Sequence, residues 1–277
     1  MNSKHVNIIA EIGINHNGDF ELCKQMIMLA KVAGCDYAKI QKREPDICVP
    51  EDQKSKIRDT PWGKMTYLDY KKRIEFNEEQ IAELVAFSKS IGIEFFASVW
   101  DITSVDIMAK YCTIGKIPSA LIHDNELCSY AREKFETLII STGMSTEEEI
   151  DNCIIYSDPD VVMHTCSTYP CPVEELNLNY IKHLQEKHGG RFEYGYSGHE
   201  YGLVTTFATV ALGVTWIERH ITFNREMWGS DHKSSVEPSG LMKLVKGVRD
   251  LEKAFAYEPQ ERILFESEKE KRKTLRK

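Results

Sequence analysis

Apolar, β-branched segments alternate along most of this chain with amphipathic segments of helical periodicity. This alternation is typical of parallel strands joined by crossover helices. Strands are predicted at residues 6–13, 37–42, 93–100, 112–118, 137–142, 160–166, 192–197 and 215–221. Helices are predicted at residues 21–34, 78–92, 102–111, 125–135, 145–157, 176–188, 201–212 and 239–255. Eight such units in one series favour an α/β fold of the single (β/α)8, or TIM, barrel class over an open doubly wound sheet.

The domain organisation follows from the same pattern. Residues 1–256 are predicted to form the barrel as one domain, and residues 257–277 a charged C-terminal arm or truncated linker. The segment 43–76, between the second strand and its helix, is predicted to be an elaborated loop on the rim where barrels keep their active sites. It is a candidate lid.

Composition and charge exclude several classes of protein. The net charge of −8 argues against nucleic-acid or anionic membrane partners. The apolar runs are far shorter than the ~20 residues that a bilayer span requires, and the N-terminus lacks the pattern of a signal peptide, so a cytoplasmic location is expected. The eight cysteines include no CxxC pair, which argues against a zinc knuckle or a disulfide framework, and most are expected to be reduced core residues.

Polar residues gather at the carboxyl ends of the predicted strands. In the last strand, Glu218, Arg219 and His220 are consecutive within an otherwise β-rich segment. The other ends carry Glu11, Lys39, Gln41, Ser98, Lys116, Ser119, Ser141, His164, Ser167, Tyr169, Ser197 and His199. In a barrel these ends converge on one bowl. Because burying unpaired polar groups is costly, the pattern predicts a bound ligand.

The charges at the strand ends indicate what that ligand carries. Lys39 and Lys116 supply positive charge, and the serines supply hydroxyl donors, which together suit a small anion with phosphate and carboxylate groups. Each lysine could instead form a structural pair with Glu11 or Glu218.

Two histidines point to a metal. His199 and His220 end two strands that are adjacent in a barrel, so their imidazoles can converge on one divalent cation and leave positions open for water and substrate. The alternative for either residue is a hydrogen-bonded core histidine.

Several motifs together carry a family resemblance. They are AEIGINHNGD, YAKIQ, KMTYLDYKKRIEF, KIPS, STGMSTEEEI, HTCSTYPCP, GYSGH, ALGVTWIERHIT and WGSDHKSSVEP. In this order and spacing the chain resembles the sialic acid synthase family from about residue 7 to residue 256. Enzymes of that family condense phosphoenolpyruvate with N-acetylmannosamine or a related amino sugar.

The resemblance implies a role for each position. Phosphoenolpyruvate would be held by Lys39, Lys116, Ser98, Ser119, Ser141 and Ser197. The sugar would face Glu11, Gln41, Ser167, Tyr169 and Asp231. His199 and His220 would bind manganese or, alternatively, magnesium or cobalt. The candidates for catalysis are Glu11, Lys39, Lys116 and His220. Glu11 would position the sugar or handle a proton, with simple pairing to a lysine as the alternative.

The expected reaction joins phosphoenolpyruvate, N-acetylmannosamine and water to give a nine-carbon sialic acid and phosphate. The alternatives are a legionaminic or pseudaminic acid synthase acting on a 6-deoxy diacetamido sugar, or a non-catalytic barrel subunit. A phosphorylated acceptor would need a second basic cluster on the rim, for which Lys42, Arg43 and Lys233 are the candidates. An unphosphorylated sugar is therefore favoured, and a homodimer or other homo-oligomer is expected.

The chain also departs from the family pattern. Leu121 stands where most members have a glutamate, and Ser167 where some have asparagine. The family usually continues into a small antifreeze-like domain, whereas this sequence stops at Lys277. The cap that this domain forms is expected to come from the rim segment 43–76, another subunit or a separate chain, or to be missing altogether.

Overall fold

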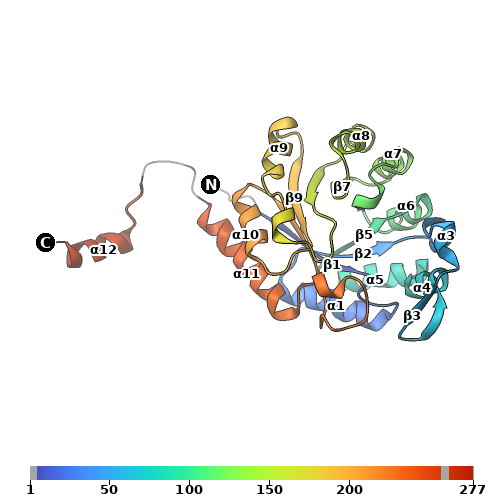
Figure 1. The fold of residues 1–277 in the computed structure, drawn as a ribbon. Coiled ribbons are helices and arrows are strands. Elements are labelled where there is room, and N and C mark those ends of the chain that lie inside the picture. The colour runs from blue at the N-terminus through green and yellow to red at the C-terminus, as the bar shows by residue number, and fades with distance from the viewer. Residues whose placement is uncertain (1–4, 257–261, 277) are drawn as a thin grey trace.

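A computed structural model of the protein describes residues 5–256 and 262–276. Within them, eight parallel strands close into a barrel in the order β1-β10-β9-β8-β7-β6-β5-β2, with helices around it (Figure 1). The barrel strands are β1 (Asn7–Gly13), β2 (Tyr37–Lys42), β5 (Glu94–Val99), β6 (Ile114–Ile117), β7 (Thr137–Ser141), β8 (Val161–Thr165), β9 (Glu193–Gly198) and β10 (Trp216–His220). The surrounding helices are α1 (Phe20–Ala33), α5 (Glu78–Ile91), α6 (Ile102–Ala109), α7 (Asn125–Lys134), α8 (Glu147–Ser157), α9 (Tyr180–Lys187), α10 (Val204–Ala211) and α11 (Pro238–Ala254). The predicted (β/α)8 barrel is confirmed.

Several helices are shorter than predicted, among them α9 and α10. The segment 176–188 was expected to be helical throughout, but α9 begins only at Tyr180. Asn177 has a φ of 42°, in the left-handed region, and residues Val173–Glu175 form a separate 3₁₀ turn before it. A right-handed helix cannot continue through a left-handed residue, so this turn and α9 are separate elements.

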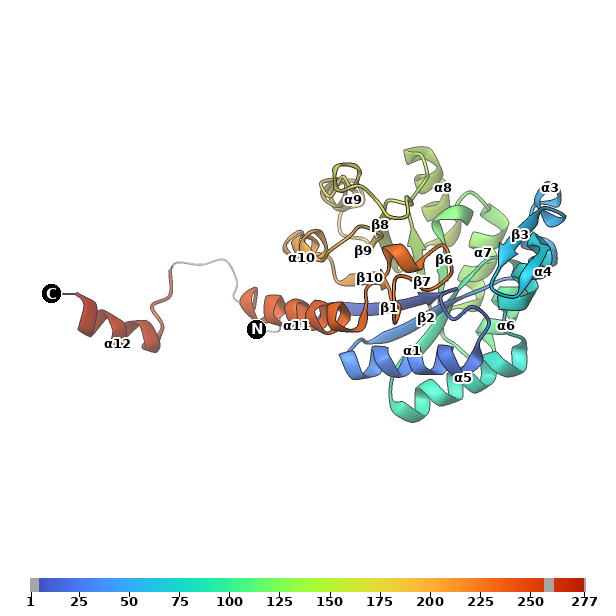
Figure 2. The same cartoon turned by 60° about the horizontal axis from the view of Figure 1, so that its bottom comes forward.

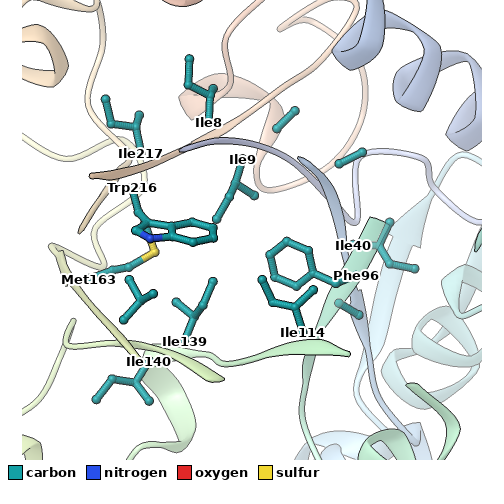
Figure 3. Close-up of a cluster of buried hydrophobic side chains, with 14 of the residues drawn as sticks. Ile8, Ile9, Ile40, Phe96, Ile114, Ile139, Ile140, Met163, Trp216 and Ile217 are labelled. Carbon is teal, nitrogen blue, oxygen red and sulfur yellow. The ribbon is translucent and has the colours of Figure 1, made fainter. Parts of the chain in front are cut away.

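The barrel interior shows why polar residues collect at one end. Side chains alternate along each strand, so Ile9 and Trp216 point into the barrel and pack with Phe96 and Met163, whereas Ile8 points outward towards the helices (Figure 3). Two residues further along their strands, the next inward positions are occupied by acidic residues, Glu11 after Ile9 and Glu218 after Trp216. The apolar layer therefore forms the floor beneath the polar carboxyl end.

The same alternation explains the three consecutive ionisable residues of the last strand. Glu218 and His220 face the inside of the barrel. Arg219 points the other way, where its guanidinium contacts Glu200, which follows β9, and Thr206 of α10. These charges thus occupy opposite faces of β10 and belong to different environments.

The rim segment 43–76 is more ordered than the predicted loop. It contains α2 (Pro45–Cys48), α3 (Glu51–Lys54), the antiparallel pair β3 (Ile57–Thr60) and β4 (Gly63–Thr66), and α4 (Tyr67–Ile74). Tyr70 packs edge-on against Trp228, with 5.3 Å between ring centroids, and Trp62 lies 6.0 Å from the same ring. These contacts attach the segment to the loop after β10. A lid function for it stays a prediction.

The predicted C-terminal arm is only partly described, because residues 257–261 and 277 lie outside the described residues. Its helix α12 (Glu266–Leu275) buries none of its side chains and is drawn away from the barrel (Figure 2). Across residues 5–256 and 262–276, every helix is too short or too polar to cross a membrane.

Candidate active site

A cavity of about 250 Å³ opens at the carboxyl ends of the barrel strands. The residues predicted to take part in catalysis or to bind substrate or metal line it, namely Glu11, Lys39, Gln41, Ser98, Lys116, Ser119, Ser141, Ser167, Tyr169, Ser197, His199, His220 and Asp231. The barrel thus brings together side chains that are more than two hundred positions apart in the sequence. Their individual roles remain predictions.

Lys39 lies at the centre of a buried polar ring. Its Nζ is 2.6 Å from Glu11 Oε2, 2.8 Å from Ser98 Oγ and 3.5 Å from Glu218 Oε2. Of these three oxygens, Ser98 Oγ accepts a hydrogen bond, whereas the two carboxylate oxygens pair with the ammonium group by charge. The pairing with carboxylates weighed from the sequence is therefore present for Lys39.

Lys116 is paired with a carboxylate, but not all of its N–H donors are used. Its Nζ donates to Glu218 Oε1 over 2.7 Å, and Ser197 Oγ donates to the same oxygen over 3.0 Å. Within the described chain this carboxylate is the one hydrogen-bond partner of Lys116 Nζ, so two of its N–H donors are available to a ligand. The neighbouring Ser141 Oγ is buried and has no hydrogen-bond partner among the described residues. Lys116 and Ser141 are consequently the best-placed donors for an anion.

The pKa values of Lys39 and Lys116 shift in opposite directions, in line with this difference in pairing. Burial lowers the pKa of Lys39, but the charges of Glu11 and Glu218 outweigh it, and the net shift is upward. For Lys116, burial is the largest effect, and the repulsion from Lys39 adds to it, so that its pKa is lowered even beside Glu218. Burial would raise the pKa of Glu218, but the two lysines hold it below the ordinary range.

His199 and His220 lie side by side, with ring centroids 5.4 Å apart. His199 Nδ1 donates to the carbonyl oxygen of Cys166 over 2.8 Å, which leaves its Nε2 with a free lone pair. Burial, followed by the charge of His220, lowers the pKa of His199 to about 3, so this imidazole is neutral at ordinary pH. A neutral imidazole held by a carbonyl through its second nitrogen is the form that binds metals.

The second imidazole has a free nitrogen as well. His220 Nδ1 is buried, lacks a hydrogen bond to any described residue, and lies 3.9 Å from Asp231 Oδ2. Two imidazoles and a nearby carboxylate fit a divalent cation that keeps open positions for water or substrate. Tyr169 covers the pair, with its ring centroid 4.0 Å from that of His199 and 5.9 Å from that of His220.

Two basic residues of the rim segment complete the wall. Arg43 Nε pairs with Glu75 Oε1 over 2.7 Å, its guanidinium lies over the Trp100 ring and donates to Gln41 Oε1, and Lys71 lines the same cavity. The strand-end argument could not find Lys71, because α4 lies outside the strand and helix repeat. Of the other proposed cations, Lys42 lies 3.9 Å from Glu75 Oε2, and Lys233 is exposed. Neither lines the cavity.

Lys71 is a buried cation without an acidic partner in contact. Among the described residues, no ion pair or hydrogen bond reaches its Nζ, which lies 5.3 Å from the ring centroids of both Tyr67 and Tyr70. Burial, and then the nearby charge of Arg43, lowers its pKa to about 8. Such a group is suited to an anionic or hydrogen-bonding ligand.

One other position differs from the sequence-based expectation. His164 was counted among the bowl residues, but its side chain turns outward and its Nε2 contacts the carbonyl oxygen of Leu176 at 2.7 Å. Leu121 packs against the hydrophobic core, beside Ser119 and Ala120, which do line the cavity. Thr165, which follows His164 on β8, is the residue of that strand that lines the cavity.

Comparison with known proteins identifies the family. A model of the NeuB family matches residues 26–259. Human N-acetylneuraminate-9-phosphate synthase is 35% identical over 254 residues, covering 89% of this chain and 70% of that protein. N,N'-diacetyllegionaminic acid synthase from Campylobacter jejuni is 31% identical over 265 residues, covering 91% of this chain and 78% of that protein.

A solved structure agrees with these sequence matches. It is an N-acetylneuraminic acid (sialic acid) synthetase from Leptospira borgpetersenii in complex with citrate, with a TM-score of 0.86 and 29% identity. The similarity covers 99% of this chain and 93% of that one. Because the family match spans most of the chain and the fold agrees, this protein belongs to the NeuB family and, within it, is related to the sialic acid synthases.

Proposed function

We propose that this chain condenses phosphoenolpyruvate with an N-acetylated amino sugar and water, giving a nine-carbon sugar acid and phosphate. N-acetylmannosamine is the favoured acceptor. One observation carries the proposal. Lys116 and Ser141, which have hydrogen-bond donors left for a ligand, share one cavity with the imidazoles of His199 and His220. The names of the relatives, which are sialic and legionaminic acid synthases, support the same reaction.

Lys116, Ser141 and Ser98 would hold the phosphate and carboxylate of phosphoenolpyruvate. As C3 of the enol bonds to the aldehyde carbon of the sugar, C2 gains positive character, and a negatively charged setting stabilises it. Water then adds to C2 and loses a proton, and the C2–O bond to phosphate breaks. Holding both reactants in one cavity supplies much of the rate through their proximity.

A divalent ion, with manganese favoured over magnesium or cobalt, would be held by His199 and His220, and when bound would polarise the aldehyde oxygen as a Lewis acid. Glu11 lies in the same cavity, paired with Lys39. We assign it the positioning of the sugar hydroxyls or the transfer of a proton. Gln41, Tyr169 and Asp231 would complete the sugar contacts.

A second candidate acceptor is a phosphorylated amino sugar. It is favoured by Lys71 and Arg43, which place two cations on the rim side of the cavity. The human relative is named a 9-phosphate synthase. Acceptors of the 6-deoxy diacetamido class, as for the legionaminic and pseudaminic acid synthases among the relatives, form the third group to be tested.

An acceptor screen tests these proposals. The protein is incubated with phosphoenolpyruvate, manganese and each of N-acetylmannosamine, its 6-phosphate and a 6-deoxy diacetamido sugar, and both released phosphate and the mass of the product are measured. Turnover of N-acetylmannosamine supports the favoured acceptor. Absence of turnover with every acceptor would favour the non-catalytic alternative.

A matched pair of variants separates the first two acceptors. If the phosphate of the acceptor binds Lys71, then Lys71→Met should raise KM for the 6-phosphate by about tenfold, equivalent to about 1.4 kcal/mol. Lys72→Met is the control, because Lys72 is exposed and pairs with Asp46 instead. Light scattering of the same preparation measures whether the protein forms the expected homodimer or another homo-oligomer.

A further inference from the structure

The loop after β8 holds a cluster of donor atoms that the proposed reaction does not use. Cys166, Cys171 and Glu175 each place one potential ligand atom within 4.8 Å of the others. In the part of the chain that the structure describes, no other three His, Cys, Asp or Glu residues come this close together. The cluster was not expected from the sequence, where the spacing of the cysteines argued against a zinc site.

Local structure brings the three residues together. Cys171 is fixed against the end of β9, because its backbone nitrogen donates to the carbonyl oxygen of His199 over 3.1 Å. The 3₁₀ turn Val173–Glu175 then reverses the chain, so that Glu175 returns towards Cys171. The resulting spacing is C-x4-C-x3-E within a single loop.

The donor set selects the kind of ion. Thiolates favour soft or borderline cations, and zinc is commonly bound by sulfur together with a carboxylate or imidazole. Three protein ligands complete a tetrahedron when water takes the fourth position. Hard cations such as magnesium and calcium prefer sites made only of oxygen ligands. They are therefore not the ions expected at this site.

The cluster is accessible from a cavity next to the catalytic one. Cys166 and Glu175 line a hollow of about 570 Å³, bordered also by Ser145 and Tyr180. Met144 and Ser167 lie in the walls of both cavities. An ion can therefore reach Cys166 and Glu175 without passing through the phosphoenolpyruvate site.

The loop is also in direct contact with the candidate metal ligand of the active site. The carbonyl oxygen of Cys166 accepts the hydrogen bond from His199 Nδ1, and Tyr169, which lies between the two cysteines in sequence, packs against the same imidazole. A connection between Cys166 and Cys171 would fix both ends of the segment that carries Tyr169. The cluster is therefore placed to set the mobility of this wall of the active site.

We propose that Cys166, Cys171 and Glu175 bind one thiophilic divalent cation of the zinc class, and that the bound ion fixes the segment 166–171 over His199. The two thiols lose their protons to solvent as the metal–sulfur bonds form, and no electron transfer is involved. The site is separate from the His199 and His220 pair and does not depend on the proposed reaction.

The test uses the full chain under a non-thiol reductant, with cobalt(II) and zinc(II) as probes. Cobalt should produce a thiolate-to-metal charge-transfer absorption, and equilibrium dialysis should show one tightly bound zinc per chain in the His199→Ala/His220→Ala double variant. Cys171→Ser should abolish the absorption. Glu175→Gln should weaken zinc binding by at least about tenfold, since even changes beyond the direct ligands of metal sites cost about 10–100-fold.

Two controls keep the result interpretable. Cys48→Ser changes another partly buried cysteine, outside the cluster, and should leave the cobalt absorption unchanged. Glu175 is exposed, so Glu175→Gln should fold even if Cys171→Ser does not. Absence of the thiolate absorption in the unmodified protein, or an equal absorption in Cys171→Ser, would overturn the proposal.

Hydrogen exchange tests the structural consequence. Zinc should slow amide exchange within residues 166–175 of the unmodified protein and leave Cys171→Ser unaffected. Unchanged exchange in the presence of bound zinc would reject the claim that the ion fixes this segment. Because neither measurement uses turnover, failure of the proposed function would not affect the outcome.

Discussion

The two faces of β10 each bury charged residues, but in different ways. On the outer face, Arg219 and Glu200 are both almost fully buried, with Arg219 Nη1 3.1 Å from Glu200 Oε1 and Nη2 2.6 Å from the Glu200 carbonyl oxygen. Thr205, Thr206 and Tyr196 donate further hydrogen bonds to the Glu200 carboxylate. Of the Arg219 nitrogens, only Nε lacks a partner among the described residues.

On the inner face, the hydrogen bonding of the buried polar groups is less complete. Within the described chain, Ser141 Oγ and His220 Nδ1 are buried without hydrogen bonds, and Lys116 has donors to spare. A buried group without a partner costs about 1–3 kcal/mol, so a set of them is maintained only where a ligand supplies the missing contacts. The comparison suggests that the outer cluster stabilises the fold, whereas the inner cluster is arranged for binding.

The largest expected effect on stability is on the outer face. Arg219→Met leaves the buried Glu200 carboxylate without its countercharge and should lower the free energy of unfolding by about 3–5 kcal/mol. Urea denaturation followed by circular dichroism measures this. The double variant Arg219→Met/Glu200→Leu should recover part of the loss, because it removes both charges. A loss below about 1 kcal/mol for the single variant would contradict a structural role for the pair.

On the inner face, the largest expected effect is on activity. His220→Ala removes one of the two imidazoles proposed to hold the metal, and turnover should fall at least about a hundredfold, since Lewis-acid catalysis contributes several kcal/mol. The melting temperature should change little. His164→Ala is the matched control, because His164 faces out of the cavity. Full turnover of His220→Ala, or of the unmodified protein in excess chelator, would contradict the metal assignment.

The pH dependence of stability tests whether Lys71 is an unpaired buried cation. Because its folded-state pKa lies below the usual value, at about 8, folded Lys71 loses its proton before unfolded Lys71 does. Stability should therefore rise as the pH increases from about 8 to about 10.5, by up to about 3 kcal/mol, at about 1.4 kcal/mol per pKa unit. The measurement is urea denaturation across this range, with Lys71→Met as reference. An equal pH dependence in both proteins would show that Lys71 is not a destabilising buried cation.

The smallest expected effect separates the two inner lysines. Lys116→Met should raise the phosphoenolpyruvate requirement by about tenfold, or about 1.4 kcal/mol, because its spare donors face the ligand. Stability should change less than in Lys39→Met, since Lys39 contacts both Glu11 and Glu218. Initial rates across a phosphoenolpyruvate titration give the first quantity, and urea denaturation the second. An unchanged titration for Lys116→Met would remove this residue from the anion site.

The strands and the location of the site could be predicted from local patterns. Residues 37–42 form β2 with the boundaries expected, and Glu11, Lys116 and His220 line the predicted bowl. The positions of the side chains follow from a two-residue alternation and from the convergence of strand ends in a barrel. Neither depends on knowing which distant residues become neighbours.

Other contacts depend on how the chain folds outside the repeating pattern of strands and helices. Lys71 reaches the cavity from α4, and Glu175 approaches Cys171 because a 3₁₀ turn redirects the chain between them. Sequence spacing gave no sign of either contact. Nor did it indicate the left-handed Asn177 that precedes the shortened α9.

The sequence by itself determined the barrel, the polar end of its strands and the family, because periodicity and residue order along the chain encode all three. Only the tertiary structure decided which charges are paired and which remain available. That distinction depends on distances between residues of different strands, as between Lys116 and Glu218 across the barrel, and on the burial that makes an unpaired group costly.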